Sequence, residues 1–173
     1  TATLCNDSRI KRKDAKEYYV FGNPTEIALS IAAAKAGIIK ENLKSTRIEE
    51  LLFSSERKLM SVLCEERLEK YIYVKGAPEI LLKKCKFIHR GNKIINIEDD
   101  EKEKILEVNK KLTSDSFRTL ALAYKKVTSV NKNNFEEQLV FLGLMALEDP
   151  PREEVKNSIT MCKAAGIKVK IVT

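Results

Sequence analysis

Residues 71–79 contain the feature that most constrains the fold, a β-rich run that passes directly into a helix start. Aromatic and β-branched residues fill the run up to Val74, which is typical of a strand. The strand ends at Gly76, and Pro78 can occupy the first helical turn, where a backbone N–H is not needed. Lys75 stands at the mouth of this unit, and the glycine beside it lets a ligand or another backbone segment come close. Taken alone, such a lysine is more often solvated beside the turn.

Two further runs, residues 48–53 and 58–64, flank a short polar connection and predict a β-hairpin. Phe53 ends the first run, where an exposed ring could hold a flat ligand, and Arg57 and Lys58 place positive charge nearby. By itself, a phenylalanine in this position is more often part of the core. Both interpretations stay open at this point.

A helix start with all its parts in order lies at residues 23–26. Asn23 suits the N-cap, Pro24 the first helical position, and Glu26 the return partner of a capping box. Gly37 is expected to end this helix. The capping role explains Glu26 without a ligand and is the more frequent role for a glutamate in this place.

Other patterns predict the remaining strands and helices. They are a brief apolar run over residues 19–21, a helix from Pro78 to about Cys85, a hairpin over residues 86–97 turning at Gly91, a helix over residues 99–112, and strands over residues 116–124 and 139–147. Residues 9–16 are rich in charge, and we expect them to form an exposed loop.

Residues 149–152 interrupt the pattern, because two adjacent prolines fit neither a central strand nor the middle of a helix. We interpret them as a hinge. Residues 153–165 then predict a helix ended by Gly166, and residues 167–173 predict a strand. A helix and one strand make half of a parallel βα unit, which cannot bury both of its faces. We therefore expect the main domain, or a neighbouring molecule at the strand edge, to hold this tail.

The 173 residues include 32 basic and 25 acidic side chains, a net charge of +7. A basic nucleic-acid-binding or interaction module is therefore an alternative to a small-molecule site. The two signs are mixed along the chain, which indicates a solvated surface more than a basic face.

The chain contains four cysteines, none at a metal-binding spacing, and a single histidine, His89. This argues against a zinc site and indicates free cysteines in a reducing compartment. No apolar run approaches the length of a membrane span, and the first residues do not resemble a signal peptide. We expect a soluble, cytosolic chain.

Five short motifs in a fixed order resemble the cytosolic loop of P-type cation-transporting ATPases. They are residues 22–26, 53–62, 75–79, 117–123 and 149–152, and residues 4–7 resemble the start of the family's nucleotide-binding domain. The pattern is most similar to the calcium-pump branch, and sodium/potassium and proton/potassium pumps share several of the motifs.

The resemblance implies an α/β (α+β) fold with a twisted, mainly antiparallel sheet flanked by helices. It implies a nucleotide-binding domain over residues 1–147, followed by a hinge and a βα piece of the phosphorylation domain over residues 148–173. The implied nucleotide-binding residues are Glu26, Phe53, Lys58, Met60, Lys75, Gly76, Arg118 and Leu120.

The same resemblance gives these residues roles. It implies that Phe53 stacks on adenine, that Met60 packs along the purine, and that Lys75 lines the same pocket. Glu26 is similar to the carboxylate near the adenine amino group. The implied ligand is ATP, with Mg²⁺ carried by the nucleotide.

At the ribose and phosphate end, Lys58 and Arg118 are similar to the family's cations. Some calcium pumps have arginine where this chain has Ser55, so one phosphate contact is expected to be weaker here.

The implied reaction of the parent pump is phosphoryl transfer from Mg-ATP to an aspartate whose motif this sequence lacks. Thr173 is similar to the first residue of a Thr-Gly-Asp motif whose other two residues are missing. We expect a chain that binds ATP without turnover, with no catalytic and no metal-ligating residue of its own. The implied partners are the phosphorylation and actuator domains and the membrane helices of the pump, and no nucleic acid. The chain is then a cytoplasmic domain of an integral membrane protein.

Overall fold

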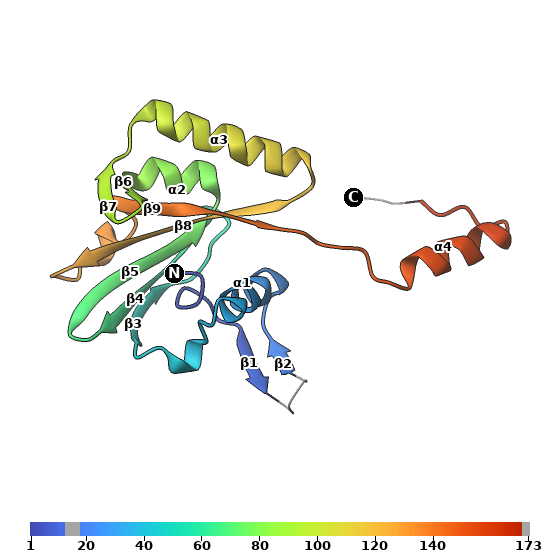
Figure 1. Ribbon diagram of the computed structural model, residues 1–173, viewed down its shortest axis with the longest axis horizontal. Helices are drawn as coiled ribbons and strands as arrows, with labels where there is room; N and C mark the ends of the chain where they lie inside the picture. The colour runs from blue at the N-terminus through green and yellow to red at the C-terminus, as the bar shows by residue number, and fades with distance from the viewer. Residues whose placement is uncertain (13–17, 171–173) are drawn as a thin grey trace.

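A computed structural model describes residues 1–12 and 18–170. Within these residues the strands form a seven-stranded sheet and a separate two-stranded ribbon. The order in the large sheet is β3-β4-β5-β8-β9-β6-β7. Figure 1 shows this sheet as a twisted layer with helices on both sides.

The sheet and its short turns have the following bounds. In chain order they are η1 (Lys40–Asn42), β3 (Thr46–Leu51), β4 (Leu59–Glu66), β5 (Glu69–Gly76), β6 (Cys85–Arg90), β7 (Lys93–Asn96), β8 (Arg118–Val127), η2 (Lys132–Asn134) and β9 (Leu139–Leu147). Neighbouring strands run antiparallel except β6 and β9, which are parallel. The expected α/β (α+β) class with a mainly antiparallel sheet is confirmed, as are the β3–β4 and β6–β7 hairpins.

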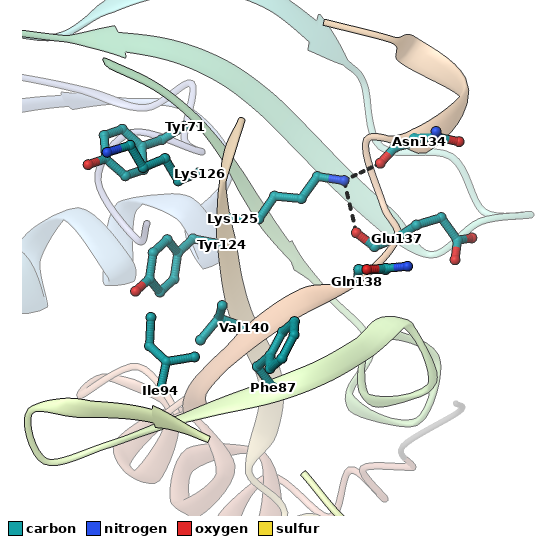
Figure 2. A pocket seen from close by; sticks show the side chains of 10 residues that line it. All are labelled: Tyr71, Phe87, Ile94, Tyr124, Lys125, Lys126, Asn134, Glu137, Gln138 and Val140. Carbon is teal, nitrogen blue, oxygen red and sulfur yellow. Dashed lines mark hydrogen bonds between the residues drawn. The ribbon is translucent and has the colours of Figure 1, made fainter. Parts of the chain in front are cut away.

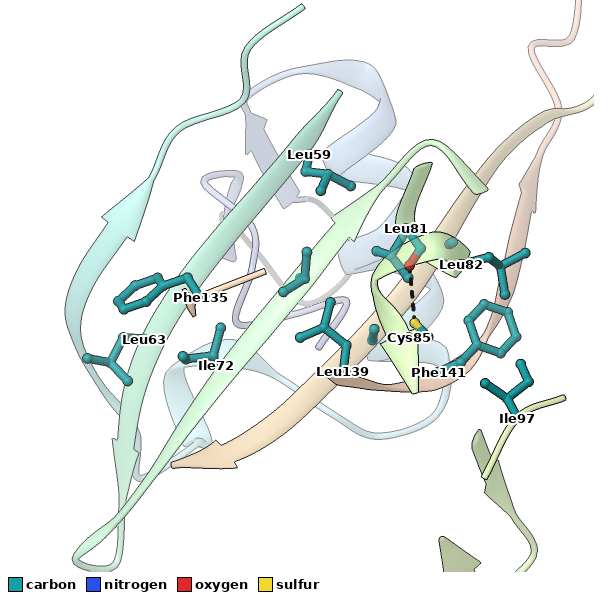
Figure 3. Close-up of a cluster of buried hydrophobic side chains, with 13 residues drawn as sticks. Leu59, Leu63, Ile72, Leu81, Leu82, Cys85, Ile97, Phe135, Leu139 and Phe141 are labelled. Atoms are coloured by element: carbon teal, nitrogen blue, oxygen red, sulfur yellow. Dashed lines mark hydrogen bonds between the residues drawn. The ribbon is translucent and has the colours of Figure 1, made fainter. Parts of the chain in front are cut away.

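The strand–turn–helix unit forms as predicted, because β5 ends at Gly76 and α2 (Pro78–Lys84) begins at Pro78. Together with α3 (Asp99–Ser114), α2 covers one face of the sheet (Figure 1). The main core lies beneath these helices, and alternating strand positions supply its side chains. Its members, most of which Figure 3 labels, are Leu59, Leu63, Ile72, Val74, Leu81, Leu82, Cys85, Ile97, Ala121, Ala123, Phe135, Leu139 and Phe141.

The opposite face of the sheet carries the strand residues that lie between these core positions. Met60, Val62 and Cys64 of β4 are buried there against Cys5 of the N-terminal segment. Helix α1 (Pro24–Lys35) lies beside this segment (Figure 1). The candidate site described below is on this face.

Helix α1 begins and ends where its sequence signals predict. The Asn23 side chain accepts a hydrogen bond from Thr25 N at 2.9 Å, and Pro24 is the first helical residue. Gly37 follows the last turn with a φ of +75°, a conformation that glycine adopts without strain.

The prediction of an exposed loop over residues 9–16 is wrong for residues 9–12, which form a strand. Strand β1 (Arg9–Arg12) pairs antiparallel with β2 (Tyr18–Phe21), and residues 13–17 lie outside the described part of the chain. The ribbon projects from the body (Figure 1), and Tyr19 is half exposed. A two-stranded ribbon buries little surface, so its first strand carries no apolar pattern that a sequence reading could detect.

The C-terminal tail also departs from expectation. Helix α4 (Val155–Ala164) forms, but residues 167–170 form no strand, and residues 171–173 lie outside the described part. No residue of α4, all of which the structure describes, is buried, and Figure 1 shows the helix away from the sheet. The expectation that the main domain holds this tail is therefore wrong, while packing on a neighbouring molecule stays a prediction. A strand needs a partner for its backbone N–H and C=O groups, and the described residues provide none here.

Candidate functional site

A cavity of about 620 Å³ lies where the start of α1, the β3–β4 loop and the ends of β5 and β8 meet. It is lined by Asn23, Thr25, Glu26, Phe53, Ser55, Lys58, Met60, Lys75, Gly76, Ala77, Arg118, Thr119 and Leu120. All eight residues implied by the resemblance are among them. The fold therefore brings these residues from four separate segments to one place.

The strand register explains why distant residues face one cavity. Met60 of β4 lies opposite Lys75 of β5, and Lys75 lies opposite Leu122 of β8. Residues directly opposite each other point to the same face of a sheet, and so do residues two apart along a strand. Leu120 and Arg118 therefore continue this face toward the start of β8. Met60 is 3% exposed and provides an apolar floor.

Phe53 lies two residues beyond the end of β3, not inside the strand as predicted. Phe53 is 61% exposed, so its interpretation as a core phenylalanine is wrong. It borders the cavity from the loop between β3 and β4. An exposed ring beside an apolar floor is suited to stacking on a planar ligand.

Lys75 and Glu26 form an ion pair in the cavity wall. Their side chains are only 9% and 14% exposed, so the interpretation of Lys75 as a solvated lysine is wrong. Glu26 Oε2 also accepts a hydrogen bond from Asp7 N at 3.2 Å. Within the described residues the bonds of this carboxylate go to these two partners, and the predicted capping-box bond to Asn23 is not among them. The pair links α1 to β5 and fixes a carboxylate beside an ammonium group.

A buried asparagine, Asn6, holds the start of α1 in place. Its Nδ2 donates hydrogen bonds to the carbonyls of Ala2 at 3.0 Å and Glu26 at 2.9 Å. Its Oδ1 accepts from Ser8 N at 2.8 Å and from Ser8 Oγ at 2.7 Å. A fully bonded buried amide is a specific structural anchor. Residues 4–7 resemble the family in sequence, but no local pattern joins them to Glu26, so this support for Glu26 could not be predicted.

At position 76 only glycine fits, because the start of β4 lies too close to leave room for a side chain. A Cβ added at this position would lie 2.3 Å from the carbonyl oxygen of Lys58 and 2.6 Å from Leu59 Cδ2. The same carbonyl accepts a hydrogen bond from Ala77 N at 3.1 Å. The glycine was expected to allow the close approach of a ligand or of another backbone segment, and the approach of a backbone segment is confirmed.

Two exposed cations border the cavity. Lys58 has a φ of +54°, an uncommon left-handed conformation for a residue with a side chain. Arg118 Nη1 donates a hydrogen bond to Thr25 Oγ1 at 3.0 Å, a contact that no sequence pattern predicts. Among the described residues neither cation is paired with a carboxylate, so both charges are available to an anion.

Comparison with known proteins identifies the family. A family profile described as P-type ATPase, cytoplasmic domain N, matches residues 1–154. The chain belongs to this family.

Curated relatives agree with this assignment of the N domain. The chain is 38% identical to calcium-transporting ATPase 1 of Bacillus cereus and 38% identical to the calcium-transporting ATPase of Bacillus subtilis. It is 39% identical to calcium-transporting ATPase 1 of Lactococcus lactis. Each alignment covers 98% of this chain and 19–20% of the relative. The chain therefore spans about a fifth of the length of the curated relatives that it matches.

The N domain has a second and larger cavity, of about 1020 Å³, at the other end of the central strands. Figure 2 shows its lining, with rings of Tyr71, Phe87 and Tyr124 among the walls. Lys125 Nζ donates hydrogen bonds to the carbonyls of two loop residues that also line the cavity, and burial lowers the pKa of this lysine. Lys126 is paired with a glutamate of β5. The cations of this cavity are thus already engaged, and none of the eight implied residues lies there.

The described part of the N domain contains no group of three or more His, Cys, Asp or Glu side chains that could hold a metal ion. None of its described helices is both long enough and apolar enough to cross a lipid bilayer.

Proposed function

We propose that this N domain binds ATP in the cavity at the start of α1. One observation carries the proposal: the exposed ring of Phe53 and the exposed cations Lys58 and Arg118 border a single cavity with an apolar floor. A purine is recognised by a planar partner and a triphosphate by positive charge, and one ligand combines both needs.

The adenine end of the ligand is assigned to the apolar part of the cavity. Phe53 stacks on the base, while Met60 and Leu120 pack along it. Glu26 accepts a hydrogen bond from the adenine amino group. Lys75 contributes by holding the Glu26 carboxylate in position through their ion pair.

The phosphate end is assigned to Lys58 and Arg118. Gly76 supports this end, because its missing side chain makes room for the Lys58 carbonyl. Ser55, at the rim, provides a hydroxyl where some calcium pumps have a cation. Mg²⁺ arrives with the nucleotide.

The role in the parent protein is to position Mg-ATP for phosphoryl transfer to an aspartate outside this chain. Such transfer depends mainly on positioning and on neutralising charge. The parent is proposed to be a membrane pump that hydrolyses ATP to transport Ca²⁺, as the names of its relatives state for them. Its phosphorylation and actuator domains and its membrane helices are the proposed partners, and the chain alone binds nucleotide without turnover.

Residues 148–173 are proposed to be a hinge followed by a piece of the phosphorylation domain. The observation that supports this is the exposure of apolar side chains in a segment where none of the described residues, 148–170, is buried. Met161, Ile167 and Val169 are 73%, 57% and 50% exposed. Exposed apolar side chains in series indicate an absent partner surface.

The direct test is a calorimetric titration of the 173-residue chain with MgATP. Replacing Phe53 by alanine should weaken binding roughly 5- to 150-fold, the range found for aromatic side chains that stack on bases. Phe21→Ala is the matched control, since this phenylalanine is 56% exposed and lies outside the cavity. Equal affinity in the wild type and Phe53→Ala would contradict the proposal.

A further inference from the structure

The loop that carries Phe53 is shaped on one side by its own turn. Lys58 N donates a hydrogen bond to the Ser54 carbonyl at 2.7 Å, and Arg57 N donates to Ser54 Oγ at 3.2 Å. These bonds fix the backbone after Phe53. They do not hold the residue before it, Leu52, which lies beyond the end of β3.

The Arg57 side chain provides the missing attachment. Its Nη2 donates a hydrogen bond to the Leu52 carbonyl, so the guanidinium reaches back across the loop. Its Nη1 pairs with Glu136 Oε1, which belongs to the connection between β8 and β9. The planar guanidinium suits such a bridge, because its donors point in fixed directions. Phe53 therefore lies in a segment whose two ends are both held.

Glu136 is itself fixed to the body of the domain. Its side chain is 13% exposed, and Oε1 also accepts a hydrogen bond from Ser61 Oγ at 2.5 Å. Ser61 is fully buried on β4. The neighbouring Phe135 is fully buried in the main core. The Glu136 carboxylate is thus bonded to a buried strand residue, and the residue before it in the chain is fixed in the core, so Glu136 is a rigid anchor for Arg57.

We infer that Arg57 and Glu136 are positioning residues for nucleotide binding, and that they act by holding the backbone that presents the Phe53 ring. This inference rests on the proposed function, because it assumes that the ring stacks on the base. Neither residue lines the cavity. The sequence pattern gives Arg57 only a positive charge near Phe53, and it gives Glu136 no role.

The physical reason is that an exposed ring depends on its backbone for orientation. Phe53 is 61% exposed, so packing against neighbours contributes little to its position. If the loop samples several arrangements, only a fraction of molecules presents the ring correctly, and the apparent affinity falls by that fraction. The Arg57–Glu136 pair raises this fraction before the ligand arrives.

The test is a calorimetric titration of the full chain with MgATP for Glu136→Gln, made both in the wild type and in Phe53→Ala. Glu136→Gln should weaken binding roughly three- to tenfold in the wild type, within the range of coupling between interacting residues. In Phe53→Ala the same substitution should change affinity less than about twofold, because the ring through which it acts is gone. A merely structural role for Glu136 would weaken binding equally in both backgrounds.

The matched control is Glu137→Gln, which makes the same substitution at the next residue of the same loop. Glu137 pairs with Lys84 at 2.6 Å on the surface and has no bond to Arg57 among the described residues. This control should leave affinity unchanged. If Glu136→Gln does not fold, Arg57→Gln is titrated in its place with the same expectation in both backgrounds.

The outcomes separate the two proposals. Wild-type chain that does not bind MgATP would overturn the proposed function. Binding that Phe53→Ala weakens, but that Glu136→Gln changes no more than Glu137→Gln does, would overturn the positioning role alone. Equal losses from Glu136→Gln with and without the Phe53 ring would overturn it as well.

Discussion

Lys75 illustrates at the scale of one residue how burial changes an interpretation. The local sequence shows only a lysine before a glycine at a strand end, and such a lysine is usually solvated. Its partner Glu26 is 49 residues away in the chain, so no short pattern contains both. The fold joins them in a wall where each side chain is mostly buried. A mostly buried charge is stable only with its partner, so the two residues have to be considered as one unit.

This unit gives a prediction about stability. Lys75→Met should lower the free energy of unfolding by about 3 kcal/mol, because it leaves the Glu26 carboxylate with a single backbone donor in a mostly buried place. The double variant Glu26→Gln/Lys75→Met should recover part of that loss, since the unpaired charge is gone. Urea denaturation of the three proteins measures both effects. A double variant less stable than Lys75→Met would show that the pair does not act as described.

At the scale of elements, strong local signals predicted structure well, and elements defined by distant partners were missed. The start of α1 and the β5–α2 unit follow from Asn23, Pro24, Gly76 and Pro78, whose effects are local. β1 has a charged sequence and depends on β2 for its definition. Residues 167–170 have a strand-like sequence, but no partner lies beside them in the described chain. Pairing in a sheet joins residues that are far apart in the chain. A local sequence pattern shows that a segment suits a strand, but it does not show which partner strand is available.

The four cysteines differ in burial, and this difference predicts which thiols react. Cys5 and Cys85 are buried, and burial raises the pKa of each thiol to about 12. Burial also raises the pKa of Cys64, whereas Cys162 on α4 is partly exposed. At pH 8 the thiolate fraction of Cys5 and of Cys85 is about 10⁻⁴, so these two thiols should be inert. Cys64 is 1% exposed, so its burial shields it from a reagent.

A disulfide reagent at pH 8 should therefore modify Cys162 rapidly and the other three only after unfolding. Peptide mass mapping of the modified chain identifies the residues. The variant Cys162→Ser is the control and should show almost no fast reaction. Rapid labelling of Cys5 or Cys85 in the folded chain would contradict the described packing.

At the scale of the whole molecule, the order of the strands in the sheet brings the residues of the site together. β8 lies next to β5, although α2, α3 and two other strands separate them in the chain. This neighbourhood brings Arg118 and Leu120 to the same cavity as Phe53 and Lys75. The spacing of residues indicated a ring, some cations and a glycine, and only the family resemblance grouped the eight residues. The grouping is not local, so composition and periodicity alone could not have provided it.

The detached tail gives a prediction about the whole chain. Removing residues 148–173 should change the free energy of unfolding by less than about 0.5 kcal/mol, because α4 buries nothing against the domain. Affinity for MgATP should also be unchanged, since no lining residue is lost. Urea denaturation and calorimetry of the shortened chain measure both quantities. A loss of several kcal/mol would mean that the tail packs on the domain in solution.

The central claim is that MgATP occupies the cavity at the start of α1, and backbone amide NMR of the labelled chain tests it most directly. Addition of MgATP should shift the signals of residues that line this cavity, above all those near Phe53, Lys58, Gly76 and Leu120. Signals of the second cavity, around Tyr71 and its neighbours, should stay in place. Shifts confined to the second cavity, or no shifts at millimolar MgATP, would contradict the claim.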